Sequence, residues 1–182
     1  MRIISGRLRG KRLEWVSDST TRPTTDRVKE NIFNVLVSSG VDIPSAKVLV
    51  LFAGSGQMVL ECFSRGSTSI VLNDTSKTAI GIIKKNCASA NLSPNIIGLD
   101  YMDALGKLKP QKFDLVFLDP PFALPDAADN AVKYLLENDM LAPSAIIVIE
   151  SESNQTQAPD FDGFSVHVKT YGRETIYFLS VI

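Results

Sequence analysis

Between residues 47 and 150 the chain alternates short apolar runs with longer segments whose apolar residues recur at helical spacing. The first run, KVLVLF at 47–52, is continuous, as in a strand that is buried on both faces of a sheet. Four similar runs follow at 69–74, 95–99, 113–119 and 145–150. Predicted helices separate these runs at 56–65, 76–90, 102–108 and 126–138. This order predicts an α/β fold of three layers, in which a mostly parallel sheet has helices on both faces.

The end of the chain breaks this order. Residues 164–171 and 174–182 alternate apolar and polar positions and are joined by Gly172-Arg173. Two such runs around a short turn predict an antiparallel hairpin. Together with the five preceding strands, the hairpin completes a seven-stranded sheet with an antiparallel edge.

Two elements precede the sheet. Residues 25–38 have the apolar spacing of a helix, with Thr24 or Thr25 as the N-cap. Residues 1–16 alternate loosely and contain glycine breakers, which predicts a hairpin. A chain of 182 residues suits one hydrophobic core. We therefore expect a single domain that spans the whole chain, with residues 1–20 as an N-terminal arm.

Charge is unevenly distributed along the chain. The formal net charge is −1, which does not by itself indicate a nucleic-acid-binding protein. The first twelve residues, however, contain no acidic side chain and five basic ones, namely Arg2, Arg7, Arg9, Lys11 and Arg12. A basic arm can contact phosphates even when the protein is nearly neutral. The alternative is the ordinary solvated surface of a hairpin.

Cysteine usage and hydropathy exclude several classes of protein. Cys62 and Cys87 lie in predicted helices and lack metal-ligand spacing, so we expect buried thiols, no metal site and no disulfide framework. The start of the chain lacks the apolar core of a signal peptide. No apolar run approaches the length of a membrane span. We expect a cytoplasmic monomer without a membrane partner.

The first predicted strand ends in the motif Phe52-Ala53-Gly54-Ser55-Gly56. Two glycines between a strand and a helix let a ligand approach the backbone, and the start of the helix offers N–H groups to an anion. A dinucleotide fingerprint has a third glycine where Gln57-Met58-Val59 stand, which disfavours NAD and FAD. The motif indicates a nucleotide-like ligand, and the alternative is a tight turn that only needs glycine.

Acidic residues follow the second and third predicted strands. Asp74 ends the second strand, where a carboxylate can accept hydrogen bonds from both ribose hydroxyl groups, and Asn73 beside it is a candidate to assist. Asp103 is expected in the loop after the third strand, as an acceptor for an adenine amino group. Each aspartate has an alternative role as a helix N-cap, for which Ser76 competes with Asp74.

The motif Asp119-Pro120-Pro121-Phe122 directly follows the fourth predicted strand. Two prolines cannot continue a parallel strand, and they hold the backbone rigid and extended. The Asp119 carboxylate and the Pro120 carbonyl then form two fixed acceptors for the two hydrogens of an exocyclic base amine. Such an arrangement aims the nitrogen lone pair at an electrophilic methyl group, and Phe122 offers a flat surface for an extruded base. The alternative is a proline-rich turn with Phe122 in the core.

Together these motifs resemble the amino-directed class of Rossmann-like methyltransferases. The resemblance narrows to the RsmD family almost from end to end, through MRIISGRLRGKRL, TRPTTDRVKENIFNVL, VLFAGSG, ECFSRG, FDLVFLDPPF and IIVIESE. It implies an S-adenosylmethionine-dependent enzyme that methylates the 2-amino group of a guanine in 16S ribosomal RNA. The implied partner is the small ribosomal subunit or an assembly intermediate of it.

The resemblance also implies roles for individual residues. Gly54-Ser55-Gly56 would hold the methionine end of the cofactor, Asp74 the ribose and Asp103 the adenine. The stretch before the first helix, Arg22, Pro23, Thr24 and Thr25, would lie near the cofactor and the target, and Arg22 would join the basic arm in binding RNA. The cofactor candidates are thus Phe52, Ala53, Gly54, Ser55, Gly56, Asn73, Asp74, Asp103 and Thr25, and the catalytic ones are Asp119, Pro120, Pro121 and Phe122.

Two positions depart from the family pattern, and both concern cofactor binding. Val50 stands where the family has an acidic residue, and Gln57-Met58-Val59 stands where it has small residues. Weaker binding, compensation by Gln57 and lost activity are the possible consequences. Two alternatives therefore stand beside guanine methylation. They are adenine-N6 methylation of DNA or RNA, which the same catalytic motif serves, and a non-catalytic RNA-binding assembly factor with a decayed cofactor site.

Overall fold

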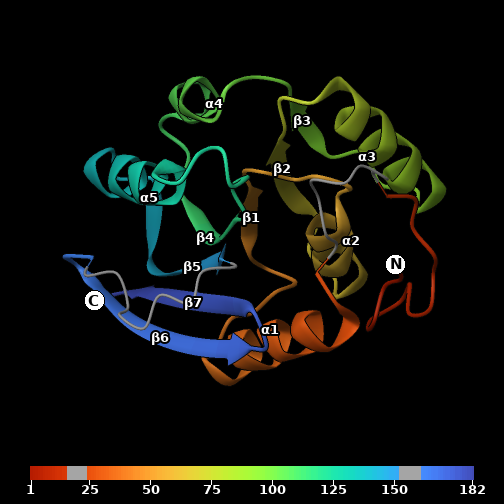
Figure 1. Ribbon diagram of the computed structural model, residues 1–182, viewed down its shortest axis with the longest axis horizontal. Helices are drawn as coiled ribbons and strands as arrows, with labels where there is room; N and C mark the ends of the chain where they lie inside the picture. The colour runs from red at the N-terminus through yellow and green to blue at the C-terminus, as the bar shows by residue number, and fades with distance from the viewer. Residues whose placement is uncertain (16–23, 152–160) are drawn as a thin grey trace.

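The computed structural model describes residues 1–15, 24–151 and 161–182 (Figure 1). Its helices are α1 (Asp26–Ser38), α2 (Gln57–Ser64), α3 (Lys77–Ser89), α4 (Tyr101–Leu108) and α5 (Ala127–Glu137). Its strands are β1 (Lys47–Val50), β2 (Ser69–Asn73), β3 (Asn95–Ile97), β4 (Phe113–Leu118), β5 (Leu141–Ser151), β6 (Phe164–Tyr171) and β7 (Glu174–Val181). The alternation of strands and helices predicted from the sequence is confirmed.

The seven strands form one sheet in the order β3-β2-β1-β4-β5-β7-β6. Strands β1 to β5 are parallel, and β7 is antiparallel to both β5 and β6. The predicted mixed sheet with an antiparallel C-terminal hairpin is therefore confirmed. The chain builds outward from β1 to β3 and then returns to place β4 on the other side of β1. In parallel sheets the crevice at such a reversal of strand order is where ligands bind.

Alternating residues of each strand point into two separate cores. Val48 and Val50 face the side covered by α1, α2 and α3, whereas Leu49 faces the side covered by α4 and α5 (Figure 1). Both Val48 and Leu49 are fully buried. This burial on both faces explains why the β1 segment is a continuous apolar run rather than an alternating one.

The structure corrects several predicted boundaries. β1 ends at Val50 instead of residue 52, because the glycine loop begins there. β5 begins at Leu141, four residues earlier than predicted. Its first part pairs irregularly with β4, and exposed Pro143 and Ser144 lie in the irregular stretch, so it lacks the apolar signature of a regular strand. Both cysteines are buried as predicted.

The helix N-caps decide between the alternatives that the sequence left open. Thr25 caps α1 and accepts a hydrogen bond from the N–H of Val28. Ser76 caps α3 by accepting from the N–H of Ala79, so Asp74 is not the cap of that helix.

Residues 1–14 form the predicted hairpin, and it docks on α2 and α3. A bridge pairs Arg2 with Arg12, and Ile3 is fully buried. Gly6 lies against α2 so closely that a Cβ atom there would come within 2.0 Å of the Ser64 carbonyl oxygen. The N–H groups of residues 7 and 8 donate to the carbonyl and hydroxyl oxygens of the same serine, at 2.8 and 2.9 Å. The arm is thus an integral part of the fold.

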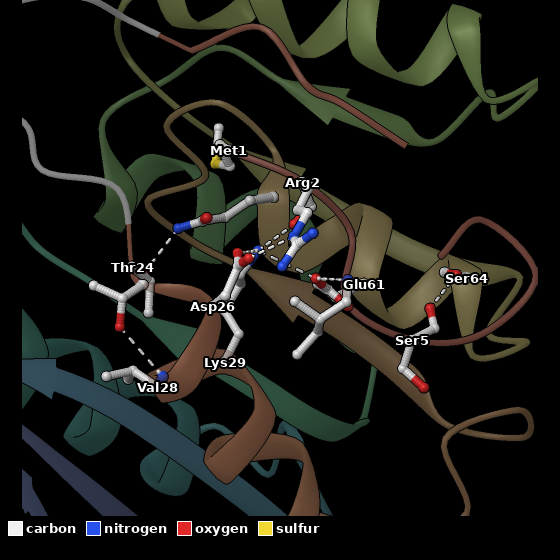
Figure 2. A network of polar contacts seen from close by, with 12 residues as sticks. Met1, Arg2, Ser5, Thr24, Asp26, Val28, Lys29, Glu61 and Ser64 are labelled. Carbon is white, nitrogen blue, oxygen red and sulfur yellow. Dashed lines mark hydrogen bonds and ion pairs between the residues drawn. The ribbon is translucent and has the colours of Figure 1, made fainter. Parts of the chain in front are cut away.

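A buried ionic network anchors the start of the arm (Figure 2). The Lys29 ammonium is fully buried, lies 3.3 Å from Glu61 and 3.4 Å from Asp26, and donates to the carbonyl oxygen of Arg2. Glu61 also pairs with Arg65 and accepts from the backbone N–H of residue 4 at 3.0 Å. Burial favours a raised pKa for Asp26, but the hydrogen bond from Arg2 and the charge of Lys29 outweigh it and lower the pKa.

Candidate active site

The glycine loop and the Asp-Pro-Pro-Phe motif lie side by side at the reversal of strand order. β1 and β4 are neighbours, with Val50 opposite Phe117. Their pairing continues past the end of β1, where the N–H of Leu51 donates to the carbonyl oxygen of Phe117 at 3.1 Å. The first motif starts one residue after Leu51, and the second starts two residues after Phe117. The two motifs that were separated by more than sixty residues in sequence therefore meet at one edge of the sheet.

The glycine loop has the backbone conformation that its composition predicts. Gly54 and Gly56 have φ angles of 54° and 78°, a region that favours glycine. A Cβ atom on Gly54 would have no neighbour within 4 Å among residues 1–15, 24–151 and 161–182, so this part of the chain leaves the loop open on that side. A Cβ atom on Gly56 would instead lie 3.3 Å from Ile83 of α3. The first glycine thus faces open space, and the second lets the loop pack against a helix.

Asp74 connects the glycine loop to the start of α3. Its Oδ2 accepts from the N–H of Gly54 at 2.8 Å, and its Oδ1 accepts from the N–H of Ser76 at 2.9 Å. Each carboxylate oxygen keeps a further lone pair, and the residue is partly exposed, so it can still accept from ribose hydroxyl groups. Asp74 therefore has a structural role that is compatible with the predicted one.

Asn73 has a structural role that the sequence did not predict. It is buried, and its amide donates to the carbonyl oxygen of Leu99 at 3.0 Å and accepts from the N–H of Leu99 at 3.2 Å. These two bonds tie the end of β2 to the loop after β3. The side chain acts on the site by positioning that loop.

Asp103 does not lie in a loop, contrary to the prediction. α4 begins at Tyr101, so Asp103 is in its first turn and exposed. The N-cap is Asp100, whose side chain accepts from the N–H of Met102 at 2.9 Å. Asp103 lies three residues after this cap and inside the helix predicted at 102–108, so it is not the cap either. Phe52 packs against Tyr101, with ring centroids 5.5 Å apart, and links this helix to the glycine loop.

The Asp-Pro-Pro-Phe motif, which the sequence predicts to be catalytic, is exposed at the end of β4. Asp119 and Pro121 are exposed, and 70% of Phe122 is accessible to solvent. A turn follows, in which the N–H of Leu124 donates to the carbonyl oxygen of Pro121 at 2.9 Å. Leu124 is also exposed by 42%. The alternative of Phe122 as a core residue is therefore wrong, and the aromatic ring is available for a planar partner.

A chain of hydrogen bonds that the sequence reasoning missed runs beside the glycine loop. Gln57, the first residue of α2, donates from Nε2 to Thr24 Oγ1 at 2.8 Å. Thr24 in turn donates to the Glu150 carboxylate, whose oxygens lie 3.0 and 3.2 Å away. Three residues distant in sequence are thereby joined, and only the tertiary structure brings them together. Thr25, the predicted cofactor residue, is exposed and caps α1 instead of joining this chain.

Asn86 of α3 is a second residue without a sequence signature. Its amide nitrogen donates to the carbonyl oxygens of Ser55 and Glu14, at 2.9 and 2.8 Å, and its oxygen accepts from the N–H of Glu14. It thus braces the glycine loop and the N-terminal arm at once. The Ser55 hydroxyl also lies 3.7 Å from the Met1 sulfur.

The residues that depart from the family pattern leave the open side of the glycine loop clear. Val59 is fully buried, and Met58 packs against the same core as α1 and α3. Val50 is also buried in that core. The side chains of Val50, Met58 and Val59 therefore pack into the protein and away from the space beside Gly54. The loop, Asp74 and the start of α2 fit an adenosine cofactor with an amino-acid tail.

The cations of the arm differ in their surroundings. Arg2 pairs with Asp26 at 2.7 Å, Arg7 stacks on the Phe63 ring at 3.9 Å, and Lys11 donates to the Ser89 carbonyl oxygen at 2.6 Å. Arg9 and Arg12 are exposed. Arg22 lies outside the described residues. Part of the predicted RNA-binding charge thus serves to dock the arm.

Two negative findings concern residues 1–15, 24–151 and 161–182. None of the helices in these ranges is both long enough and apolar enough to pass through a bilayer. In the same ranges no three His, Cys, Asp or Glu side chains gather in a way that could hold a metal ion.

Comparison with known proteins gives matches over nearly the whole chain. A family described as conserved hypothetical protein 95 matches residues 1–180. The ribosomal RNA small subunit methyltransferase D of Haemophilus influenzae is 36% identical over 159 residues, which cover 85% of this chain and 80% of that protein. A Bacillus subtilis protein named "Putative rRNA methyltransferase YlbH" is 34% identical over 94% of both chains. The structure named "Putative methyltransferase yhhF" from Escherichia coli has a TM-score of 0.84 at 31% identity, covering 100% of this chain and 97% of that one.

Proposed function

The chain belongs to the RsmD family of S-adenosylmethionine-dependent methyltransferases, and from this premise we propose that it methylates the 2-amino group of a guanine in 16S ribosomal RNA. The family assignment made from the sequence motifs is confirmed by the matches above. The choice of guanine and of its 2-amino group rests on that family resemblance. The small-subunit substrate is supported by the name of the Haemophilus influenzae relative.

The observation that carries the proposal is that the two motifs directly follow neighbouring, hydrogen-bonded strands. The glycine loop after β1 and Asp119 after β4 adjoin because their strands pair, with the Leu51 N–H bonded to the Phe117 carbonyl oxygen. A methyl donor held at the first motif and an amine held at the second would therefore be neighbours. Proximity and orientation of two reactants account for a large part of the catalysis in group transfer.

The cofactor, when bound, supplies an electrophilic methyl group on a sulfonium. Gly54 gives it room, and Asp74 can accept hydrogen bonds from the ribose. The N–H groups at the start of α2 suit the carboxylate of the amino-acid tail. Each of these groups lies at the end of a strand or at the start of a helix, and the sheet fixes its position.

The motif after β4 would bind the target base. The Asp119 carboxylate and the Pro120 carbonyl accept the two amine hydrogens, which turns the nitrogen lone pair toward the methyl group. Phe122, exposed by 70%, stacks on the face of the extruded base. The new bond would join the amine nitrogen to the methyl carbon as the bond between that carbon and the sulfonium sulfur breaks, which would leave S-adenosylhomocysteine. The amine would release one proton to a carboxylate oxygen of Asp119 or to solvent.

The test is methyl transfer from radiolabelled S-adenosylmethionine to small ribosomal subunits that lack the modification, followed by nucleoside analysis. We expect the label in N2-methylguanosine. Asp119→Ala should lower the rate at least about 100-fold, because preorganised electrostatic contacts in active sites contribute on this order. Cofactor affinity should stay within about twofold, because Asp119 holds the amine and not the cofactor.

Asp126→Ala is the matched control, since Asp126 is an exposed acidic residue of the same loop and its side chain makes no cap hydrogen bond to α5. Its rate should equal that of the unmodified protein. Recovery of the label in N6-methyladenosine would show that adenine, and not guanine, is the target base. Normal turnover of Asp119→Ala would show that the motif has been given the wrong role.

A further inference from the structure

One buried polar atom beside the glycine loop has no hydrogen-bond partner among the described residues, the side-chain oxygen of Gln57. Only 9% of Gln57 is exposed. The other end of the same amide is satisfied, because Nε2 donates to Thr24 Oγ1 at 2.8 Å. Such an orphaned acceptor is uncommon in folded proteins and calls for an explanation.

The orientation of this amide follows from its neighbours. Thr24 has one hydroxyl proton, and both carboxylate oxygens of Glu150 lie within 3.2 Å of its oxygen. The hydroxyl therefore donates to the carboxylate and must accept from Gln57. A reversed amide would place two acceptors against a hydroxyl that has no second proton. Glu150 thus keeps the Gln57 oxygen directed away from Thr24.

The place of the orphaned oxygen indicates what it binds. Gln57 directly follows Gly56 and is the first residue of α2, so it stands where the glycine loop meets the helix. The amino-acid tail of S-adenosylmethionine carries a carboxylate and an ammonium. Backbone N–H groups at a helix start can serve the carboxylate but not the ammonium, which needs acceptors. A buried acceptor at this point has the complementary chemistry.

We propose that the Gln57 side-chain oxygen accepts a hydrogen bond from the α-ammonium group of the cofactor, with Thr24 and Glu150 as positioning residues that hold the amide in this orientation. Gln57 then determines affinity for the amino-acid end of the cofactor. The inference depends on the cofactor of this family and is independent of which RNA base is methylated.

The experiment compares two ligands on the full-length protein without RNA. One is S-adenosylhomocysteine, and the other is its deamino analogue, which keeps the carboxylate but lacks the ammonium. Calorimetry measures both affinities for the unmodified protein, for Gln57→Met and for Gln57→Asn. Methionine has a similar length and no amide, and asparagine keeps the amide but withdraws it by one methylene. Met58→Leu, a change at the neighbouring core-packed position, is the matched control.

We expect Gln57→Met to weaken S-adenosylhomocysteine binding about 10- to 100-fold, as is typical for loss of a hydrogen bond to a charged group. The affinity for the deamino analogue should change less than about twofold in the same variant, because this ligand has no ammonium group to donate to Gln57. Gln57→Asn should show the same selective loss, and Met58→Leu should bind both ligands normally. Equal losses for both ligands, or no loss for either, would overturn the proposal.

A second measurement separates ligand binding from folding. Gln57→Met removes an oxygen that has no partner among the described residues, but it also removes the hydrogen bond from Nε2 to Thr24. Because these two effects oppose each other, the melting temperature of the ligand-free protein should change by less than about 5 °C. A fall of more than about 5 °C would show that the amide supports the fold itself and would also overturn the proposal. Failure to methylate guanine would leave these results untouched, so the two proposals fail independently.

Discussion

Replacing Lys29 by methionine removes a charge from the most buried ionic contact described in the structure. The Lys29 and Glu61 side chains are both fully buried, with 3.3 Å between the ammonium and a carboxylate oxygen. Methionine has nearly the same length and fills the space without a charge. The carboxylate of Glu61 then stays buried and loses one of its two cationic partners, Arg65 being the other.

The expected cost follows from burial. Removing one member of a buried ion pair typically lowers the free energy of unfolding by about 3–5 kcal/mol. Because Arg65 and a backbone N–H still contact Glu61, we expect the lower end of this range, about 3 kcal/mol. For a domain of this size the melting temperature should fall by about 6–12 °C.

Lys112→Met is the matched control, because the Lys112–Asp139 pair is shorter, at 2.7 Å, but its side chains are 49% and 82% exposed. An exposed ion pair contributes about 0–1 kcal/mol to stability. The loss of stability on removing the lysine should therefore depend on the burial of the pair and not on the distance between its charges. Urea denaturation at neutral pH measures both variants. The double variant Lys29→Met/Glu61→Gln should recover part of the loss, since it leaves no buried charge at position 61. The reasoning fails if Lys29→Met lowers the free energy of unfolding no more than Lys112→Met does. It also fails if the double variant loses as much free energy as Lys29→Met and Glu61→Gln lose together when each is made alone.

Three further predictions concern the arm, pH and the thiols. Gly6→Ala should detach the arm from α2, because its Cβ would lie 2.0 Å from the Ser64 carbonyl oxygen at a φ of 79°; faster amide exchange confined to residues 1–14 would show this, and unchanged protection would contradict it. The lowered pKa of Asp26 stabilises the fold above its ordinary value of 3.8, and this contribution is lost as pH falls through the folded pKa. Urea titrations should therefore show Asp26→Asn less stable than the unmodified protein at neutral pH, with a difference that shrinks as pH falls below about 3.8 and disappears only below the lowered pKa of the folded state. A difference that stays constant with pH would refute this. Burial raises the pKa of the Cys87 thiol to about 11 and raises that of Cys62 further, so a thiol reagent at pH 8 should modify neither until the protein is denatured, whereas rapid reaction of the native protein would contradict their burial.

Much of the architecture could be predicted because the local patterns are strong. The continuous apolar run of β1 reports its burial on both faces of the sheet. In β7, by contrast, Thr175 to Leu179 are buried without interruption, so the alternation expected for this segment does not correspond to burial on one face. The ends of helices were harder to predict where two nearby residues could each serve as the N-cap. Asp100 and Asp103 are both good N-caps, and only the start of α4 at Tyr101 shows which one is used.

The candidate site was predictable in part for the same reason. Gly54, Asp74 and Asp119 belong to local motifs at strand ends, and parallel strands bring their carboxyl ends to one edge. Gln57 was conspicuous in the sequence only as a departure from a pattern. Its hydrogen bond to Thr24, 33 residues away in sequence, has no local signature.

The sequence alone determined which segments become strands and helices, which motifs end the parallel strands, and the family to which the chain belongs. These properties depend on residues that are close together in the chain, where spacing and side-chain chemistry act directly. Only the tertiary structure decided that basic residues of the arm are partly used for docking and that Asn73 and Asn86 brace loops. The same is true of the Gln57 oxygen, which is buried and has no partner in the part of the chain that the structure describes. Such roles arise because packing brings together polar groups from distant segments and removes the water that would otherwise satisfy them.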